Sequence, residues 1–82
     1  MRDKTVVLGR LVAVCNELEV LPGDAAQWIL TDLVDGNVLD SMTLLQLAAL
    51  IEEEFGVVVS HEEFVAQGRT LDALAARIAS RA

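Results

Sequence analysis

The 82 residues are enough for one small domain, and 54% of them are hydrophobic, which supplies a core and excludes an intrinsically disordered chain. The net charge of −7 falls mostly on residues 32–82, which carry nine acidic and three basic side chains and would repel nucleic acid and anionic lipid. The composition, rich in Leu, Val and Ala with no Tyr, favours a small helical bundle over a β-sandwich.

The first predicted element is a helix over residues 5–18. Its hydrophobic residues recur at helical spacing and predict one apolar stripe, formed by Leu8, Leu11, Val12, Cys15 and Leu18. No histidine or other base lies near Cys15 in the sequence. We therefore expect Cys15 to be a small buried hydrophobe and not a nucleophile.

A long loop over residues 20–40 follows, because Pro22 and Gly23 end the first helix. Asp24 is expected to cap a short helical turn, and residues 35–37 to form a tight turn. The hydrophobic side chains expected to reach the core are Leu33 and either Trp28 or Ile29. A loop this long is either functional or a lid over a core that is otherwise too small, and both interpretations can hold together.

The second helix is predicted over residues 41–55, with Gly56 at its end. On a helical wheel its core face holds Leu44, Leu47, Ala48, Ile51 and Phe55. The other sides hold Met42, Leu45, Gln46, Ala49, Glu52 and Glu53. An apolar pair beside Ser41 with acidic residues at its edge is typical of a protein-binding patch, although contact with the long loop would also explain the pair. Ser41 is at a position where serine commonly caps a helix, and we expect it to help to start this one.

Two further helices complete the chain. "VVVS" predicts a short extended link, and the S-x-x-E pattern from Ser60 to Glu63 predicts a capping box that starts a short third helix. This helix should end at Gly68 and contribute Phe64 and Val65 to the core. Thr70 is expected to cap the last helix, whose apolar stripe is Leu71, Leu74, Ala75 and Ile78. The prediction is an all-α four-helix bundle, three helices longer and one short, in a single domain over residues 1–82.

The chain lacks the residues for catalysis on its own. One histidine and one cysteine cannot assemble an ordinary zinc site, and the five scattered glycines match no phosphate-binding loop. His61 follows the expected cap of the third helix and is predicted to be a solvated helix-start residue. We expect a protein that is not an enzyme and binds no metal.

Location and assembly are predicted from what the sequence lacks. A single cysteine excludes an internal disulfide and fits a reducing compartment. No stretch reaches the roughly 18 apolar residues of a membrane span, and the N-terminal segment lacks the apolar core and cleavage site of a signal peptide. We expect a cytoplasmic, monomeric, complete protein without a membrane span.

Several motifs together resemble the acyl carrier and peptidyl carrier proteins. They are "VLDSM", an amphipathic helix ending "LIEEEFGVVV", a short capped helix with a phenylalanine, and "TLDALAARI", and the likeness covers residues 5–80. The resemblance implies a four-helix bundle of the acyl-carrier type with a long first loop. It also implies that Ser41, preceded by Asp40, carries a covalent phosphopantetheine.

The resemblance further implies a set of partners. They are a phosphopantetheinyl transferase, an acyl- or aminoacyl-activating ligase, and a downstream transferase or synthase. The helix face that such proteins offer to these enzymes corresponds to Met42, Leu45, Ala49, Glu52 and Glu53. A helix N-terminus is also suited to hold the phosphodiester, because its dipole favours an anion.

The cargo class is indicated by one departure from the fatty-acid carriers. Those proteins usually read D-S-L-D at the modified serine, whereas this chain reads D-S-M-T from Asp40 to Thr43. This pattern resembles D-alanyl carrier proteins and the stand-alone aminoacyl carriers of natural-product pathways. Two alternatives stay open: an acyl carrier of fatty-acid or polyketide synthesis, and a non-catalytic helical adaptor in which Ser41 is only a cap.

Overall fold

The protein is described by a computed structural model that covers residues 3–38 and 40–81. In this part all regular structure is helical, in the order α1 (Lys4–Glu17), η1 (Ala25–Trp28), α2 (Ser41–Phe55), α3 (His61–Gln67) and α4 (Leu71–Arg81). The predicted all-α bundle with three longer helices, one short helix and a long first loop is confirmed. Leu39 of the "VLDSM" motif lies outside the described residues. None of the helices described is long and apolar enough to cross a membrane.

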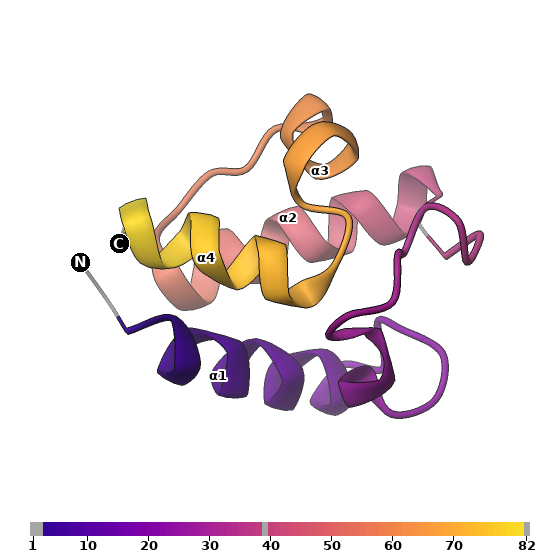
Figure 1. The fold of residues 1–82 in the computed structure, drawn as a ribbon, viewed down its shortest axis with the longest axis horizontal. Coiled ribbons are helices and arrows are strands. Elements are labelled where there is room, and N and C mark those ends of the chain that lie inside the picture. The colour runs from indigo at the N-terminus through magenta and orange to yellow at the C-terminus, as the bar shows by residue number, and fades with distance from the viewer. Residues whose placement is uncertain (1–2, 39, 82) are drawn as a thin grey trace.

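The helices pack in an arrangement that places the start of α2 at one end of the bundle. α1 packs most extensively against α4 and runs in the opposite direction. α2 lies behind them, and the short α3 crosses above α2 and α4 (Figure 1). α1 begins and α4 ends at one end of the bundle (Figure 1). The start of α2, whose first residue is Ser41, lies at the opposite end, near the long first loop (Figure 1).

Local signals set the helix ends much as the sequence predicts. Asp24 caps η1 by accepting a hydrogen bond from the Ala26 amide, at 2.9 Å. Gly56 ends α2 with a φ of 68°, a left-handed conformation that costs glycine least. Thr70 Oγ1 accepts a hydrogen bond from the Ala73 amide at 3.1 Å, as expected of the cap of α4.

The core is one continuous cluster, and its largest fully buried side chains include Leu11, Leu33, Leu47, Phe64 and Leu74. The predicted stripe of α4 is confirmed, and Ala79 joins it. Cys15 is fully buried, as predicted, and burial raises its pKa to about 11. Its thiol is therefore unreactive at neutral pH.

Two residues predicted to be in the core are not there. Leu18 is 59% exposed because it is the C-cap of α1, where the chain turns away from the bundle. Val65 is exposed because it lies about 100° around α3 from Phe64, and so short a helix buries only one face. Besides Ala79, seven buried residues were not predicted: Val7, Val14, Leu21, Ala25, Leu50, Val57 and Val59. Leu8, Val12 and Ala48, predicted to be in the core, are only half-buried at its edge.

The long first loop is tied to the start of α4 by its backbone. The Leu33 amide donates to the Arg69 carbonyl at 2.7 Å, and the Asp72 amide donates to the Ile29 carbonyl at 3.0 Å. Arg69 also forms ion pairs with Asp32 and Asp35. Leu33 is fully buried and Trp28 packs against the core, as predicted. The loop therefore completes the core, and residues 29–35 are fastened to the start of α4.

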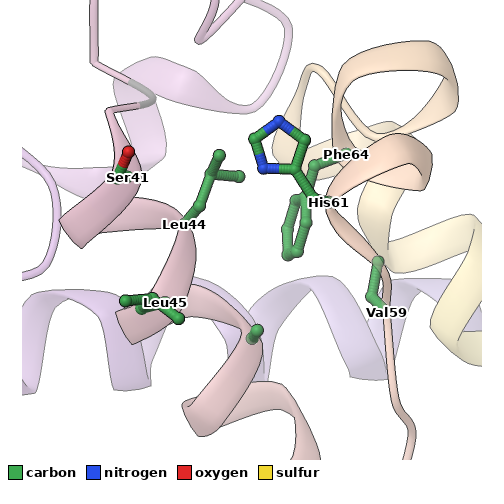
Figure 2. Close-up of a pocket in the computed structure, with 7 residues that line it drawn as sticks. Ser41, Leu44, Leu45, Val59, His61 and Phe64 are labelled. Carbon is green, nitrogen blue, oxygen red and sulfur yellow. The ribbon is translucent and has the colours of Figure 1, made fainter.

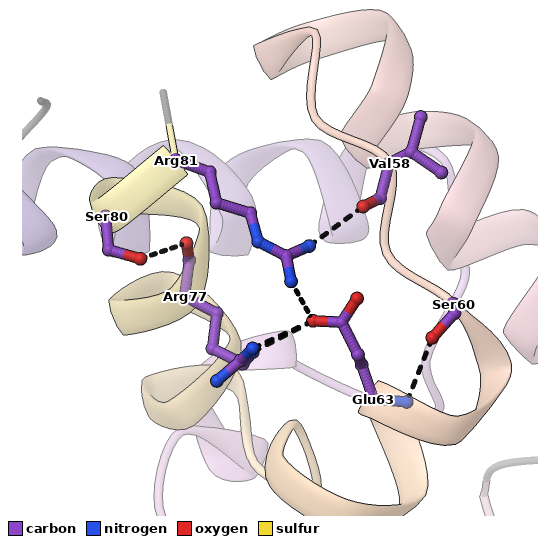
Figure 3. Close-up of polar contacts among 6 residues, drawn as sticks. All are labelled: Val58, Ser60, Glu63, Arg77, Ser80 and Arg81. Carbon is purple, nitrogen blue, oxygen red and sulfur yellow. Dashed lines mark hydrogen bonds and ion pairs between the residues drawn. The ribbon is translucent and has the colours of Figure 1, made fainter.

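A charged cluster fastens α3 to α4 and to the link before α3 (Figure 3). The Glu63 carboxylate pairs with Arg77 at 3.0 Å and with Arg81. Arg81 also donates to the Val58 carbonyl at 2.9 Å. The predicted capping box is present, because Ser60 Oγ accepts from the Glu63 amide and the Glu63 carboxylate accepts from the Ser60 amide. We call the three side chains of Glu63, Arg77 and Arg81 the α3 clamp.

The α3 clamp should make stability depend on pH. The hydrogen bonds from Arg81, and then from Arg77 and the Ser60 amide, hold the pKa of Glu63 below its ordinary value. The stabilisation by ionised Glu63 is then complete above the pKa of an unfolded glutamate, about 4.3, and is lost as pH falls through the folded pKa. We expect Glu63→Gln to lower the free energy of unfolding near pH 7, and the deficit to shrink below about pH 4.

Urea unfolding of both proteins between pH 7 and pH 3 measures this deficit. Glu62→Gln is the matched control, since Glu62 is in the same turn and forms no ion pair in the described part of the chain. A deficit that stays constant with pH, or one equally large in the control, would contradict the assigned role of Glu63.

Candidate functional site

Ser41 is the first residue of α2, but the residue that caps this helix is Asp40. The Asp40 backbone is extended, and its Oδ1 accepts a hydrogen bond from the Thr43 amide at 2.7 Å. The expectation that Ser41 helps to cap the helix was wrong, because the aspartate one residue earlier takes that position. The Ser41 side chain is therefore not needed to cap the helix.

The capping bonds also fix the charge beside the serine. Hydrogen bonds from the Thr43 amide, then from the Thr43 hydroxyl and the Met42 amide, lower the pKa of Asp40 and keep it ionised. The amides of Met42 and Thr43, at the start of α2, therefore already donate hydrogen bonds to a carboxylate. The phosphodiester expected on Ser41 would share the favourable end of the helix dipole with Asp40, so the dipole would stabilise it less than the sequence predicts.

The Ser41 hydroxyl is accessible. The side chain is exposed, and the hydroxyl takes part in none of the hydrogen bonds found among residues 3–38 and 40–81. The backbone that presents it is held on one side by the Asp40 cap and on the other by a rigid 15-residue helix. This is the arrangement that a modifying enzyme needs: a free hydroxyl on a fixed support.

A groove of about 420 Å³ opens beside Ser41, between α2 and α3. Its walls are Ser41, Leu44, Leu45, Ala48, Val59, His61 and Phe64, which are mostly apolar (Figure 2). His61 is exposed at the start of α3, as predicted, but its imidazole lies across the groove from Ser41 (Figure 2). The sequence places His61 just after the Ser60 cap, yet no local pattern relates α3 to α2. Its position at the groove could not have been predicted.

The outward face of α2 is as exposed as the helical wheel predicts. Met42 is 69% and Leu45 is 72% exposed, so neither contributes to the core through the long loop. Ala49, Glu52 and Glu53 are exposed further along the same helix. Leu45 also borders the groove, which makes this face continuous with the surroundings of Ser41.

Nothing in the described residues forms a metal-binding cluster at this place. No group of three or more His, Cys, Asp or Glu side chains there could hold a metal ion. The site that the structure presents thus consists of an accessible hydroxyl, an ionised aspartate that holds the helix start, and an apolar groove. It is suited to carry a group covalently.

Comparison with known proteins agrees with this geometry. The model of a family described as "Phosphopantetheine attachment site" matches residues 30–78, which is more than half of the chain and includes α2 and α3 whole. No curated protein and no solved structure gives a significant match. Domains of this family are non-catalytic carriers to which phosphopantetheine is attached covalently on a serine, and they work with a phosphopantetheinyl transferase and with synthases or ligases. The chain therefore belongs to the phosphopantetheine attachment site family of carrier domains.

Proposed function

We propose that this protein holds an acyl or aminoacyl group as a thioester on a phosphopantetheine arm attached to Ser41. The observation that carries the proposal is the free, exposed hydroxyl of Ser41 at the start of α2, within the matched residues. Ser41 is the serine that borders the groove, whereas the Ser60 hydroxyl accepts the capping bond of α3. The arm supplies the reactive thiol, and the protein supplies its position and its recognition by other enzymes.

The protein's own thiol does not compete with that of the arm. Cys15 is buried in α1, and burial raises its pKa to about 11, so it stays protonated and enclosed. An unpaired cysteine also fits the reducing cytoplasm, where we place the protein as a monomer. The thiol of the arm would be the one that takes up cargo.

We propose that the outward face of α2 is where partner enzymes dock. Its exposed apolar residues, Met42 and Leu45, lie next to Ser41, and Ala49, Glu52 and Glu53 continue the surface. Partners with basic surfaces would find this acidic helix by electrostatic steering, which salt weakens. These partners are a phosphopantetheinyl transferase, an acyl- or aminoacyl-activating ligase, and a downstream transferase or synthase.

Met42→Glu and Leu45→Glu should each lower kcat/KM for phosphopantetheine transfer by roughly fivefold to tenfold, because loss of a central interface contact costs about 1 kcal/mol or more. Helicity should not change, since both side chains are exposed. The measurement is the initial rate of modification with coenzyme A and a broad-specificity transferase, with circular dichroism of each variant.

Val6→Glu is the matched control for this pair. It adds the same charge at another exposed apolar residue, in the first turn of α1. The start of α1 lies at the other end of the bundle from the start of α2 (Figure 1). An equal loss of rate in Val6→Glu would show that net charge, and not this face, is responsible. Loss of helicity in Met42→Glu or Leu45→Glu would show that these residues support the core.

For the cargo we propose an aminoacyl group, transferred in a D-alanyl or natural-product pathway, because the D-S-M-T sequence resembles carriers of that kind. A second candidate is an acyl chain of fatty-acid or polyketide synthesis. The apolar walls of the groove beside Ser41 favour this alternative, since they would shelter a hydrocarbon chain from water.

The experiment that separates the two candidates reads the cargo directly. The protein is purified from its source cells under mildly acidic conditions that preserve thioesters, and the arm is ejected from it in a tandem mass spectrometer. An ejected arm carrying an amino acid supports the first candidate, and one carrying a fatty or polyketide acyl group supports the second. Absence of any arm in protein from these cells would contradict both.

A further inference from the structure

Two polar side chains face each other across the groove beside α2. Of the seven residues that line it, only Ser41 and His61 have side chains that can form hydrogen bonds. Figure 2 shows the imidazole on the α3 wall, with Leu44 between it and Ser41. A group attached to Ser41 and lying along the groove would pass over Leu44 and reach His61.

The chemical groups of a phosphopantetheine arm match the groove, which is apolar at Leu44 and polar at His61. After its phosphodiester come a geminal dimethyl group, a hydroxyl and two amides. The dimethyl group suits contact with Leu44 and Leu45, whereas the hydroxyl and the amides each lose a water partner if they lie against an apolar wall. The one side chain of the opposite wall that can replace that water is His61.

We propose that His61 is a positioning residue, which holds the arm along the groove by hydrogen bonding to its hydroxyl or amide groups. This inference rests on the proposed attachment of the arm to Ser41. The Met42 and Thr43 amides at the start of α2 are not available to bind the arm, because they already donate hydrogen bonds to the Asp40 carboxylate. The polar contact that orients the arm then comes from α3.

His61 is also held firmly enough to act in this way. It is the first residue of α3, directly after the Ser60 cap. The α3 clamp ties this first turn to α4 through Glu63, and the fully buried Phe64 anchors the helix to the core. The imidazole is therefore presented from a fixed backbone at the edge of the groove (Figure 2).

The test uses the full chain before and after modification with coenzyme A and a broad-specificity transferase. Because the chain has a single histidine, the two imidazole C–H signals in a ¹H–¹³C spectrum, from Cδ2 and Cε1, report on His61 alone. We expect the His61 and Leu44 signals to shift on modification, and the arm to show nuclear Overhauser contacts to both. A gain of mass with unchanged His61 and Leu44 signals would overturn the inference and leave the proposed function standing, whereas no gain of mass would contradict the proposed function itself.

Variants separate positioning from a general effect on structure. In modified His61→Ala the contacts between the arm and Leu44 should be lost, and His61→Gln, which keeps a hydrogen-bonding group, should retain part of them. Gln67→Ala is the control, since Gln67 is exposed on the same helix and does not line the groove. Contacts that persist in His61→Ala, or that disappear equally in Gln67→Ala, would overturn the role of His61.

Discussion

Replacing Ser41 with alanine will abolish attachment of phosphopantetheine and leave the fold almost as stable as before. The loss should be complete because no other hydroxyl has the same place at the start of α2, beside the groove. Stability should hardly change because Asp40, and not Ser41, caps the helix. Alanine also has the highest intrinsic helix propensity, so it should not disrupt α2. Intact mass and thermal unfolding of the same sample measure the two effects.

Ser60→Ala is the matched control, and it should behave in the opposite way. Ser60 caps α3 through its Oγ, so its loss should destabilise the protein by about 0.5–2 kcal/mol while modification continues. The two serines thus distinguish a structural role from a chemical one. If Ser41→Ala still gains the mass of one arm, or if Ser60→Ala loses it while folded, the assignment of Ser41 is wrong.

Leu47→Ala should be among the most destabilising single substitutions in α2. Leu47 is 0% exposed and belongs to the continuous core. Truncating such a leucine removes its apolar contacts and leaves a cavity, which costs about 2–5 kcal/mol. At about 0.05–0.15 kcal/mol per residue, a chain of this size has only roughly 4–12 kcal/mol of stability, so the variant should be close to unfolding. Urea unfolding at 25 °C gives the difference directly.

Leu45→Ala is the control two residues away in the same helix. Leu45 is 72% exposed, and its truncation should change stability by no more than about 0.5 kcal/mol. Similar losses in the two variants would mean that the outward face of α2 is packed, and the surface proposed for partner docking would not exist.

The sequence predicts most of the fold because its signals are local. Periodic hydrophobic residues and end signals at each terminus place α2 at Ser41–Phe55, with Gly56 just beyond it. The capping box predicted from Ser60 and the cap predicted from Thr70 are present for the same reason: their bonds join residues three apart. The helical wheel also separates Met42 and Leu45 from the core correctly.

Other features depend on tertiary structure or on small local differences. Leu18 fits the stripe of α1, but the chain leaves the bundle at that residue, and hydrophobicity alone cannot show this. Asp40 and Ser41 are both good capping residues, so the sequence alone could not show which of them caps α2. The position of His61 across the groove from Ser41 depends on how α3 packs against α2, which no spacing in the chain encodes.

The central claim is that Ser41 carries the arm, and one measurement tests it most directly. The unmodified wild-type protein is incubated with coenzyme A and a broad-specificity phosphopantetheinyl transferase, its intact mass is recorded, and the modified residue is located by tandem mass spectrometry. We expect a gain of one phosphopantetheine, on Ser41. An unchanged mass, or a gain located on any other residue, would contradict the claim.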